Sequence, residues 1–216
     1  HKMSAADIAM ITQNIVRDFP DYFPLFAEKE FTYNEIRQAN RNPLLYKDIG
    51  VDGMKTGHTR EAGYGLAATA RRNDRRLIAV VTGLESPSQR ASEVERLLNF
   101  GFRQFANYNL FSAGEVVISG DVWLGKMPKI GLVIEDDLTV SLHRNSRDKL
   151  RVTVKYDSPI PAPIAAGMEL GSVFVEAPGF KTIELPLVAQ EEVTLAGPIG
   201  RLKGAVSYMV FGAPNE

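Results

Sequence analysis

The first part of the chain begins with a helical pattern of apolar side chains. Ser4 is a favourable N-cap, and Asp7 follows three positions later, which makes the pair a near relative of the capping box. The next apolar residues repeat at helical spacing on one face: Ile8, Ile11, Ile15 and Val16. The pattern predicts a helix that ends at Phe19-Pro20-Asp21. A second, short helix is predicted over residues 22–26, and we expect its aromatic side chains in the core.

Strand patterns follow. A short strand is predicted at residues 31–33 and a loop at 38–43, since the residue before a proline leaves helical space. Three longer strand-like runs cover residues 51–57, 62–71 and 76–83. The run over 76–83 has no polar break in its middle, which is typical of a strand covered on both faces. A polar turn with several arginines joins the last two runs, and we interpret it as a solvated hairpin turn.

An amphipathic helix is predicted from Ser88 to about Phe105. Its inward stripe is predicted to be Val94, Leu97, Leu98, Gly101, Phe102 and Phe105. Helix, three antiparallel strands and helix together form half of an α/β sandwich.

Helical patterns disappear after residue 109 and short β runs take over. These runs cover residues 115–123, 129–134, 138–142, 150–156, 173–177 and 182–188, with Gly and Pro between them. Short strands with regular turn signals predict a small all-β sandwich. The chain is therefore α+β, and we expect three parts: residues 1–108, a β-rich domain over 109–197, and a last segment over 198–212.

The last segment has a helical pattern of its own. Pro198 suits a first helical turn, and apolar residues recur after it: Ile199, Leu202, Val206, Met209 and Val210. Such an amphipathic helix fits a membrane surface as well as it fits packing on the β-rich domain. It is too short in apolar residues to span a membrane.

Composition narrows the function classes. The 216 residues carry a formal net charge of −1, which argues against nucleic acid as the main partner. There is no cysteine, which excludes disulfides and Cys-based metal sites. The three histidines, His1, His58 and His143, show no metal-ligand spacing, and we expect neither a metal nor a cofactor. The opening His1-Lys2-Met3-Ser4 is typical of the interior of a longer protein.

The candidate chemistry lies in Lys55-Thr56-Gly57, which a clean strand pattern follows. A cation, a hydroxyl donor and a residue without Cβ in a row on a strand suit an extended peptide that ends in a carboxylate. Lys-Thr-Gly alone recurs by chance, and for the tripeptide by itself a turn with a solvated lysine is the simpler interpretation.

The surrounding blocks resemble the D-alanyl-D-alanine carboxypeptidases of the penicillin-binding protein class. The resemblance rests on residues 40–45, on 51–59, on 76–83 and on Ser88-Gln89-Arg90 before a helix. It implies part of a β-lactamase/transpeptidase-like α/β sandwich, then a β-rich domain and a C-terminal membrane-surface helix. Such enzymes combine the Lys-Thr-Gly box with a Ser-x-x-Lys nucleophile and a Ser-x-Asn-type box.

The resemblance also implies roles for residues. Lys55 would supply positive potential near the nucleophile, and Thr56 would bind the terminal carboxylate. Gly57 would let the peptide lie alongside the strand, and the backbone N–H of His58 would be an oxyanion donor. Arg90 and Arg41 would assist carboxylate binding. The alternative for each arginine is a surface salt bridge that contributes little. The partners implied are peptidoglycan stem peptides and β-lactam antibiotics, in a periplasmic protein peripheral to the inner membrane.

The nucleophile itself is not found. The one Ser-x-x-Lys match, Ser146 to Lys149, follows the Lys-Thr-Gly box instead of preceding it and lies in a polar stretch between strands. We therefore expect a preceding segment to supply the serine. Two other hypotheses stay open: a non-catalytic peptidoglycan- or partner-binding module, and a β-lactamase-related hydrolase. The β-rich domain and the terminal helix argue against the β-lactamase.

Overall fold

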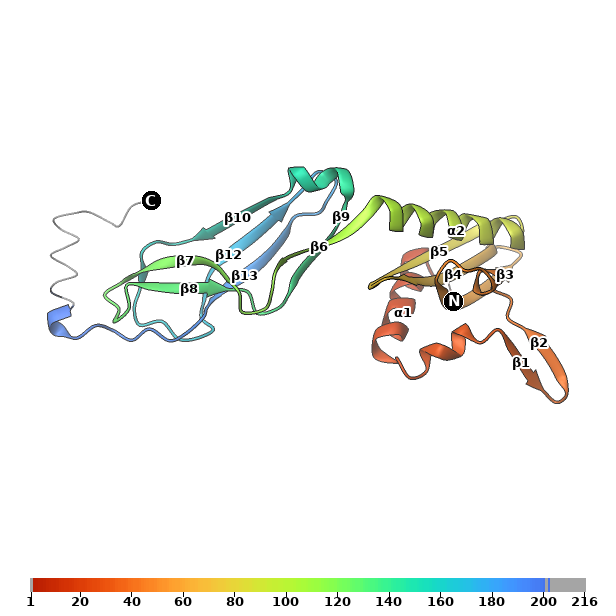
Figure 1. Ribbon diagram of the computed structural model, residues 1–216, viewed down its shortest axis with the longest axis horizontal. Helices are drawn as coiled ribbons and strands as arrows, with labels where there is room; N and C mark the ends of the chain where they lie inside the picture. The colour runs from red at the N-terminus through yellow and green to blue at the C-terminus, as the bar shows by residue number, and fades with distance from the viewer. Residues whose placement is uncertain (1, 201, 203–216) are drawn as a thin grey trace. The chain divides into compact units, whose positions relative to one another are not determined.

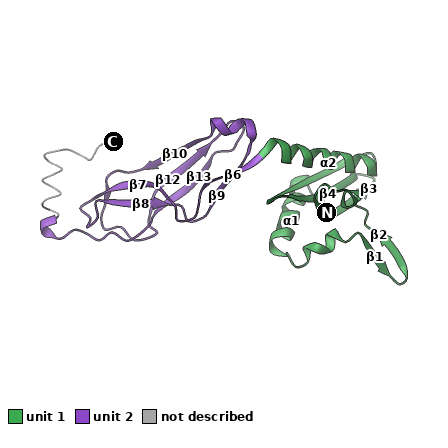
Figure 2. Cartoon of the chain, in the orientation of Figure 1, with its two compact units in different colours: residues 1–105 green, residues 106–216 purple. Residues whose placement is uncertain are grey.

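The computed structural model describes residues 2–200 and residue 202. The chain forms two compact units, residues 1–105 and residues 106–216 (Figure 2). Each unit has its own hydrophobic core. The candidate chemistry lies in unit 1, and Ser146 and Lys149 lie in unit 2.

Unit 1 opens with α1 (Ala5–Asp18), whose start has the predicted capping box (Figure 1). The backbone N–H of Asp7 donates to Ser4 Oγ at 3.2 Å, and the backbone N–H of Ser4 donates to Asp7 Oδ2 at 2.8 Å. Two backbone donors that a helix start leaves without partners are satisfied in this way. Thr12 is the only residue of α1 that is buried within the described structure.

The segment between α1 and the main sheet is largely exposed. It contains the 3-10 helix η1 (Phe23–Ala27), the hairpin of β1 (Glu30–Tyr33) and β2 (Ile36–Ala39), and the 3-10 helix η2 (Pro43–Tyr46). The expected core position of the aromatic stretch was wrong: η1 buries no residue, and Tyr22 is 66% exposed. A five-residue helix has too little length to bury a stripe. The predicted loop at 38–43 is also shorter, because β2 extends to Ala39.

The main sheet of unit 1 has the antiparallel order β3-β4-β5. Its strands are β3 (Val51–Thr59), β4 (Gly63–Arg72) and β5 (Arg75–Leu84), as the sequence pattern predicted. They form two hairpins, and Asn73, in the turn between β4 and β5, has a positive φ of 52°. A small polar side chain tolerates that conformation.

Helices cover both faces of this sheet (Figure 1). On one face, α2 (Pro87–Gln104) packs Ala91, Val94 and Leu98 against Leu66 and other apolar residues of the strands. On the other face lies α1, which contacts β5. The prediction that the 76–83 strand is covered on both faces is confirmed. The stripe predicted for α2 is correct for Val94 and Leu98, whereas Leu97 is 36% exposed.

Unit 2 is a β structure in which β7, β8, β9, β10, β12 and β13 match the predicted runs, whereas β6 and β11 were not predicted. A six-stranded sheet has the order β10-β12-β13-β8-β7-β11, and β6 pairs with β9. The bounds are β6 (Phe105–Phe111), β7 (Val116–Trp123), β8 (Lys129–Val133), β9 (Leu138–His143), β10 (Arg151–Tyr156), β11 (Ile160–Pro161), β12 (Glu169–Glu176) and β13 (Ile183–Ala189). The core consists of alternate residues of these strands, including Leu132, Val140, Val173, Val175 and Leu187.

The chain after unit 2's last strand is helical at residues 198–200 and 202. Ile199 is 87% exposed and Leu202 is 68% exposed. The other residues of the predicted amphipathic stripe, Val206, Met209 and Val210, lie outside the described residues. Within residues 2–200 and 202, no helix is both long and apolar enough to cross a membrane.

Candidate active site

Strand β3 carries the Lys-Thr-Gly motif at an edge of the sheet. In the order β3-β4-β5 it pairs with β4 alone, so its other side has no strand beside it among the described residues. An edge strand presents unpaired backbone N–H and C=O groups, which can pair with an added chain. The motif therefore lies where an extended peptide has access to backbone hydrogen-bonding groups.

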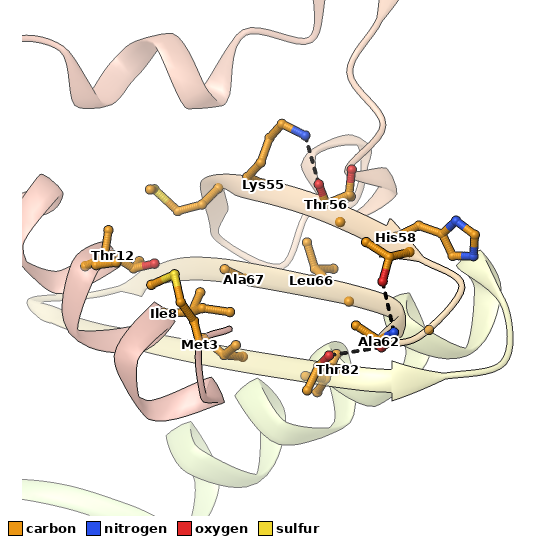
Figure 3. Close-up of a pocket in the computed structure, with 18 of the residues that line it drawn as sticks. Met3, Ile8, Thr12, Lys55, Thr56, His58, Ala62, Leu66, Ala67 and Thr82 are labelled. Carbon is orange, nitrogen blue, oxygen red and sulfur yellow. Dashed lines mark hydrogen bonds between the residues drawn. The ribbon is translucent and has the colours of Figure 1, made fainter. Parts of the chain in front are cut away.

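Lys55 reaches out over this free edge. Its side chain is exposed, and Figure 3 shows it extending away from β4 and β5. Its Nζ atom donates a 2.8 Å hydrogen bond to the backbone oxygen of Thr56, on the outer side of the strand. The ammonium group thus places positive potential at the margin of the sheet.

Thr56 and Gly57 differ in how much of them a ligand can reach. Thr56 is only 8% exposed, and its cross-strand partner is Leu66 in the core beneath α2. Gly57 is exposed, and a Cβ built there would meet no atom within 4 Å. The space beside Gly57 is therefore open, as the close approach of another backbone requires.

His58 is held by a neighbouring ring. Its imidazole stacks on the phenol ring of Tyr64, with ring centroids 4.0 Å apart and an angle of 30° between the planes. Tyr64 lies opposite His58 on β4. The stack orients the residue whose backbone N–H is the predicted oxyanion donor.

The two arginines predicted to bind a carboxylate occupy different settings. Arg41 is exposed in the turn after β2. Arg90 is 7% exposed on α2, and its Nη1 donates to the backbone oxygen of Gly57 at 3.1 Å. Arg90 therefore meets the backbone of β3, whereas Arg41 faces open solvent.

Asn42, next to Arg41, is a site residue that sequence reasoning missed. It is fully buried: its Oδ1 accepts from the backbone N–H of Leu44, and its Nδ2 donates to the backbone oxygen of Gly53, each at 3.1 Å. It ties the turn that carries Arg41 to β3 just ahead of Lys55. The Asn-Pro pair at residues 42–43 was a signal of capping that could have revealed it.

A second set of side-chain contacts, centred on Asp52, connects the three strands of the sheet. Asp52 accepts hydrogen bonds from Thr69 Oγ1 at 2.5 Å and from Arg76 Nη1 at 2.8 Å. The guanidinium of Arg76 also lies over the ring of Phe23, 4.8 Å from its centroid. Asp52 thereby connects β3, β4 and β5 as part of an ion pair.

A pocket of about 450 Å³ adjoins the motif on the α1 side of the sheet (Figure 3). Residues 54–59 form one wall, and the apolar side chains of Ile8, Ile11 and Ile15 form another. Thr12, 2% exposed, is also in the wall. Sequence reasoning missed this wall, because the pattern predicted only that the face of α1 packs inward. Among residues 2–200 and 202, no cluster of His, Asp and Glu fit to hold a metal ion is found.

The Ser-x-x-Lys match in unit 2 lies in the 3-10 helix η3 (Arg144–Lys149), which buries no residue. Ser146 Oγ donates to the backbone oxygen of Pro178 at 3.2 Å. Its partner is therefore a carbonyl and not the amine of Lys149, so these two residues do not form the nucleophile and base arrangement.

Known proteins are similar to this chain over most of its length. Residues 1–86 match the family model of D-alanyl-D-alanine carboxypeptidases, and residues 105–195 match that of the C-terminal domain of penicillin-binding protein 5. D-alanyl-D-alanine carboxypeptidase DacA of Haemophilus influenzae is 37% identical over 203 residues, which are 92% of this chain and 51% of that protein. DacA of Escherichia coli is 36% identical over 95% of this chain and 52% of that protein.

A solved structure agrees as well. Penicillin-binding protein 5 from Haemophilus influenzae matches with a TM-score of 0.78 and 35% identity, over 88% of this chain and 56% of that chain. The chain spans about half the length of the curated relatives it matches. With a family model matched in each unit and relatives aligned along more than nine-tenths of its length, this chain is similar to the D-alanyl-D-alanine carboxypeptidases.

Proposed function

We propose that this chain supplies the peptide-binding strand of a serine-type D-alanyl-D-alanine carboxypeptidase. The whole enzyme would remove the terminal D-alanine from peptidoglycan stem peptides through an acyl-enzyme that water then hydrolyses. The serine nucleophile and its lysine would come from a segment of a longer protein that precedes this chain. The observation that carries the proposal is the free edge of β3, where Lys55 and Gly57 are both exposed beside an open pocket.

The substrate would add to the sheet as an extra strand along β3. Main-chain hydrogen bonds to the edge would give affinity, and the missing Cβ of Gly57 would allow close approach. The carbonyl oxygen of Thr56 is on the outer side of β3, where it already accepts from Lys55. It would be one acceptor for the peptide.

Each retained side chain would have a distinct task. The Thr56 hydroxyl and Arg41 would bind the terminal carboxylate, and Arg90 would add positive charge behind the strand. The ammonium of Lys55 would stabilise the deprotonated form of the nucleophile network, because opposite charges favour the ionised state. The backbone N–H of His58 would stabilise the negative oxygen of the tetrahedral intermediate. β-Lactams would acylate the same serine, since they would lie along the same edge.

We also propose a periplasmic location at the inner-membrane surface. The exposure of Ile199 and Leu202 on the short described part of the last helix supports an apolar face available to lipid. Removal of residues 198–216 should release the protein from sedimenting phospholipid vesicles. Equal sedimentation of the shortened protein would contradict the anchor.

Labelling with fluorescent penicillin tests the activity. The longer protein that contains this chain should form a stable covalent adduct, and Lys55→Ala should abolish it while the unfolding temperature stays unchanged, because Lys55 is exposed. Asp74→Ala, in the exposed hairpin turn, is the matched control and should label normally. Normal labelling of the Lys55→Ala protein would remove Lys55 from the mechanism, and no labelling of the parent protein would favour a binding module.

A further inference from the structure

Arg90 is a buried cation without a carboxylate partner among the described residues. It lies in the first half of α2 and is 7% exposed, and it takes part in none of the ion pairs found in residues 2–200. Buried charges are normally paired, because loss of hydration is costly. A buried arginine that uses its charge in another way therefore needs a specific explanation.

The guanidinium is occupied by the backbone at the end of β3. Its Nη1 is 3.1 Å from the carbonyl oxygen of Gly57 and 3.5 Å from that of Gly65, the cross-strand partner of Gly57. Its Nε is buried and makes no hydrogen bond. The carbonyl oxygens of Gly57 and Gly65 thus position the guanidinium group of Arg90, while its Nε–H is left without an acceptor.

The contacted carbonyl belongs to the same peptide group as the backbone N–H of His58. Successive residues of a strand direct their backbone groups to opposite sides. The carbonyl of Thr56 is on the outer side, where Lys55 meets it, so that of Gly57 is directed into the sheet. A trans peptide group is planar, with C=O and N–H antiparallel, so the N–H of His58 is directed out over the free edge.

A second connection runs through aromatic rings. The guanidinium carbon of Arg90 is 5.6 Å from the centroid of the Tyr64 ring, and the same ring stacks on His58 at 4.0 Å. Arg90 therefore contacts the carbonyl before His58 and the ring that packs on it. Both contacts restrain the same short piece of backbone.

We propose that Arg90 is a positioning residue for the Gly57–His58 peptide group, which it holds with its N–H aimed out of the sheet edge, and that it does not contact the substrate carboxylate. The inference deepens the proposed function and rests on it for the role of that N–H. By donating to the carbonyl, Arg90 also withdraws electron density from the peptide group and strengthens the N–H as a donor. A preorganised donor stabilises a tetrahedral oxyanion more than the planar ground state.

The test compares two substrates in the longer enzyme: a peptide ending in D-alanyl-D-alanine and the same peptide as its C-terminal methyl ester. Arg90→Met keeps the apolar stem but removes the charge and the donors. We expect kcat/KM to fall about 10- to 100-fold for both substrates by a similar factor, mainly through kcat. A fall confined to the free acid would show a direct contact with the carboxylate and overturn the proposal.

Two variants serve as controls. Thr56→Val should lose activity on the free acid selectively, because its hydroxyl is the proposed carboxylate ligand. Arg90→Lys keeps the charge but cannot reproduce the planar fork, so its kcat should lie between those of Arg90→Met and the parent. Parent-like kcat for Arg90→Lys would show that charge alone matters and would also overturn the proposal.

A second measurement does not depend on activity and uses the 216-residue chain. In Arg90→Lys and Arg90→Met, the resonance of the His58 amide N–H should shift in the NMR spectrum, because its peptide group loses the hydrogen bond from Arg90, whereas the amide resonances of Val173 and Val175 in unit 2 should be unchanged. An unaltered His58 amide would contradict the positioning role even if the enzyme were active. If the parent enzyme is inactive but the His58 amide responds, the proposed function fails and the structural role of Arg90 stands.

Discussion

The Nδ2 atom of Asn42 donates a 3.1 Å hydrogen bond to the backbone oxygen of Gly53, two residues before Lys55. Asn42 is 0% exposed, and its other amide atom caps η2. One buried side chain thus holds the turn bearing Arg41 against the strand bearing Lys55. The candidate carboxylate ligand and the candidate catalytic cation are positioned by the same amide.

We expect Asn42→Ala to lower the free energy of unfolding of unit 1 by about 2–3 kcal/mol, because it leaves a buried carbonyl and a buried N–H without partners. The only tryptophan, Trp123, lies in unit 2, so unfolding of unit 1 in urea should be followed by circular dichroism. Asn145→Ala, on the exposed helix η3, should change stability by less than about 0.5 kcal/mol. Equal effects of the two changes would contradict the structural role of Asn42.

Gly57 and Gly63, both on the β3–β4 hairpin, should respond in opposite ways to a methyl group. Gly57→Ala should leave the free energy of unfolding within about 0.5 kcal/mol of the parent, since the added Cβ meets nothing within 4 Å. It should lower the rate of penicillin acylation at least about 10-fold, because the methyl occupies the space of the incoming backbone.

Gly63→Ala should instead destabilise the protein by about 1–3 kcal/mol. Gly63 has φ +62°, and its Cβ would lie 2.8 Å from the carbonyl oxygen of Leu84. Thermal unfolding and acylation kinetics of both proteins give the comparison. An unchanged acylation rate in a folded Gly57→Ala protein would show that the ligand does not lie alongside β3 at Gly57.

The Asp52–Arg76 pair should contribute more to stability than the ion pair in the adjacent turn. Asp52→Asn weakens a 2.7 Å ion pair whose side chains are 24% and 30% exposed, together with the hydrogen bond from Thr69. We expect a loss of about 2 kcal/mol. Arg71 and Asp74 are 3.8 Å apart and 62% and 104% exposed, and Asp74→Asn should cost less than about 0.5 kcal/mol. Urea unfolding of Asp52→Asn and Asp74→Asn measures the two losses of unfolding free energy. Similar losses in the two variants would contradict the larger contribution of the Asp52–Arg76 pair.

The capping box of α1 predicts a pH dependence. Hydrogen bonds from the backbone and side chain of Ser4 lower the pKa of Asp7 below its ordinary value. A carboxyl whose pKa is lower in the folded state stabilises the fold above its unfolded pKa, and this contribution is lost as the pH falls through the folded pKa. Ser4→Ala should raise the Asp7 pKa towards its ordinary value and flatten the acid limb of stability against pH. NMR titration of the Asp7 carboxyl carbon measures this, and an unchanged pKa would exclude the Ser4 hydroxyl as one of its causes.

Local patterns predicted most of the elements. Alternate residues of β4, including Ala68 and Ala70, lie in the core beneath α2. This pattern can be predicted from sequence, because successive side chains of a strand point to opposite faces of the sheet. The exposure of Tyr22 was not predicted, because whether an aromatic residue is covered depends on segments far away in sequence. β6 was missed because the helical apolar spacing of α2 runs on into Phe105.

The site was predicted in its residues more than in its contacts. Lys55, Thr56 and Gly57 follow one another in the chain, so their place along one strand edge can be inferred from the strand pattern. The contact of Arg90 with the carbonyl of Gly57 joins residues 33 apart in sequence, and no spacing rule expresses it. The Asn-Pro pair signals only the cap made by Asn42, whereas its contact with Gly53 ends on a backbone atom, which carries no sequence signal.

The most direct test is a crystal structure of the longer protein acylated by a β-lactam. The account predicts a ligand lying along the outer edge of β3, with its carboxylate hydrogen-bonded to the hydroxyl of Thr56 and its acyl oxygen accepting from the backbone N–H of His58. A ligand bound to a serine that does not adjoin β3, or one that leaves the edge beside Gly57 empty, would contradict it.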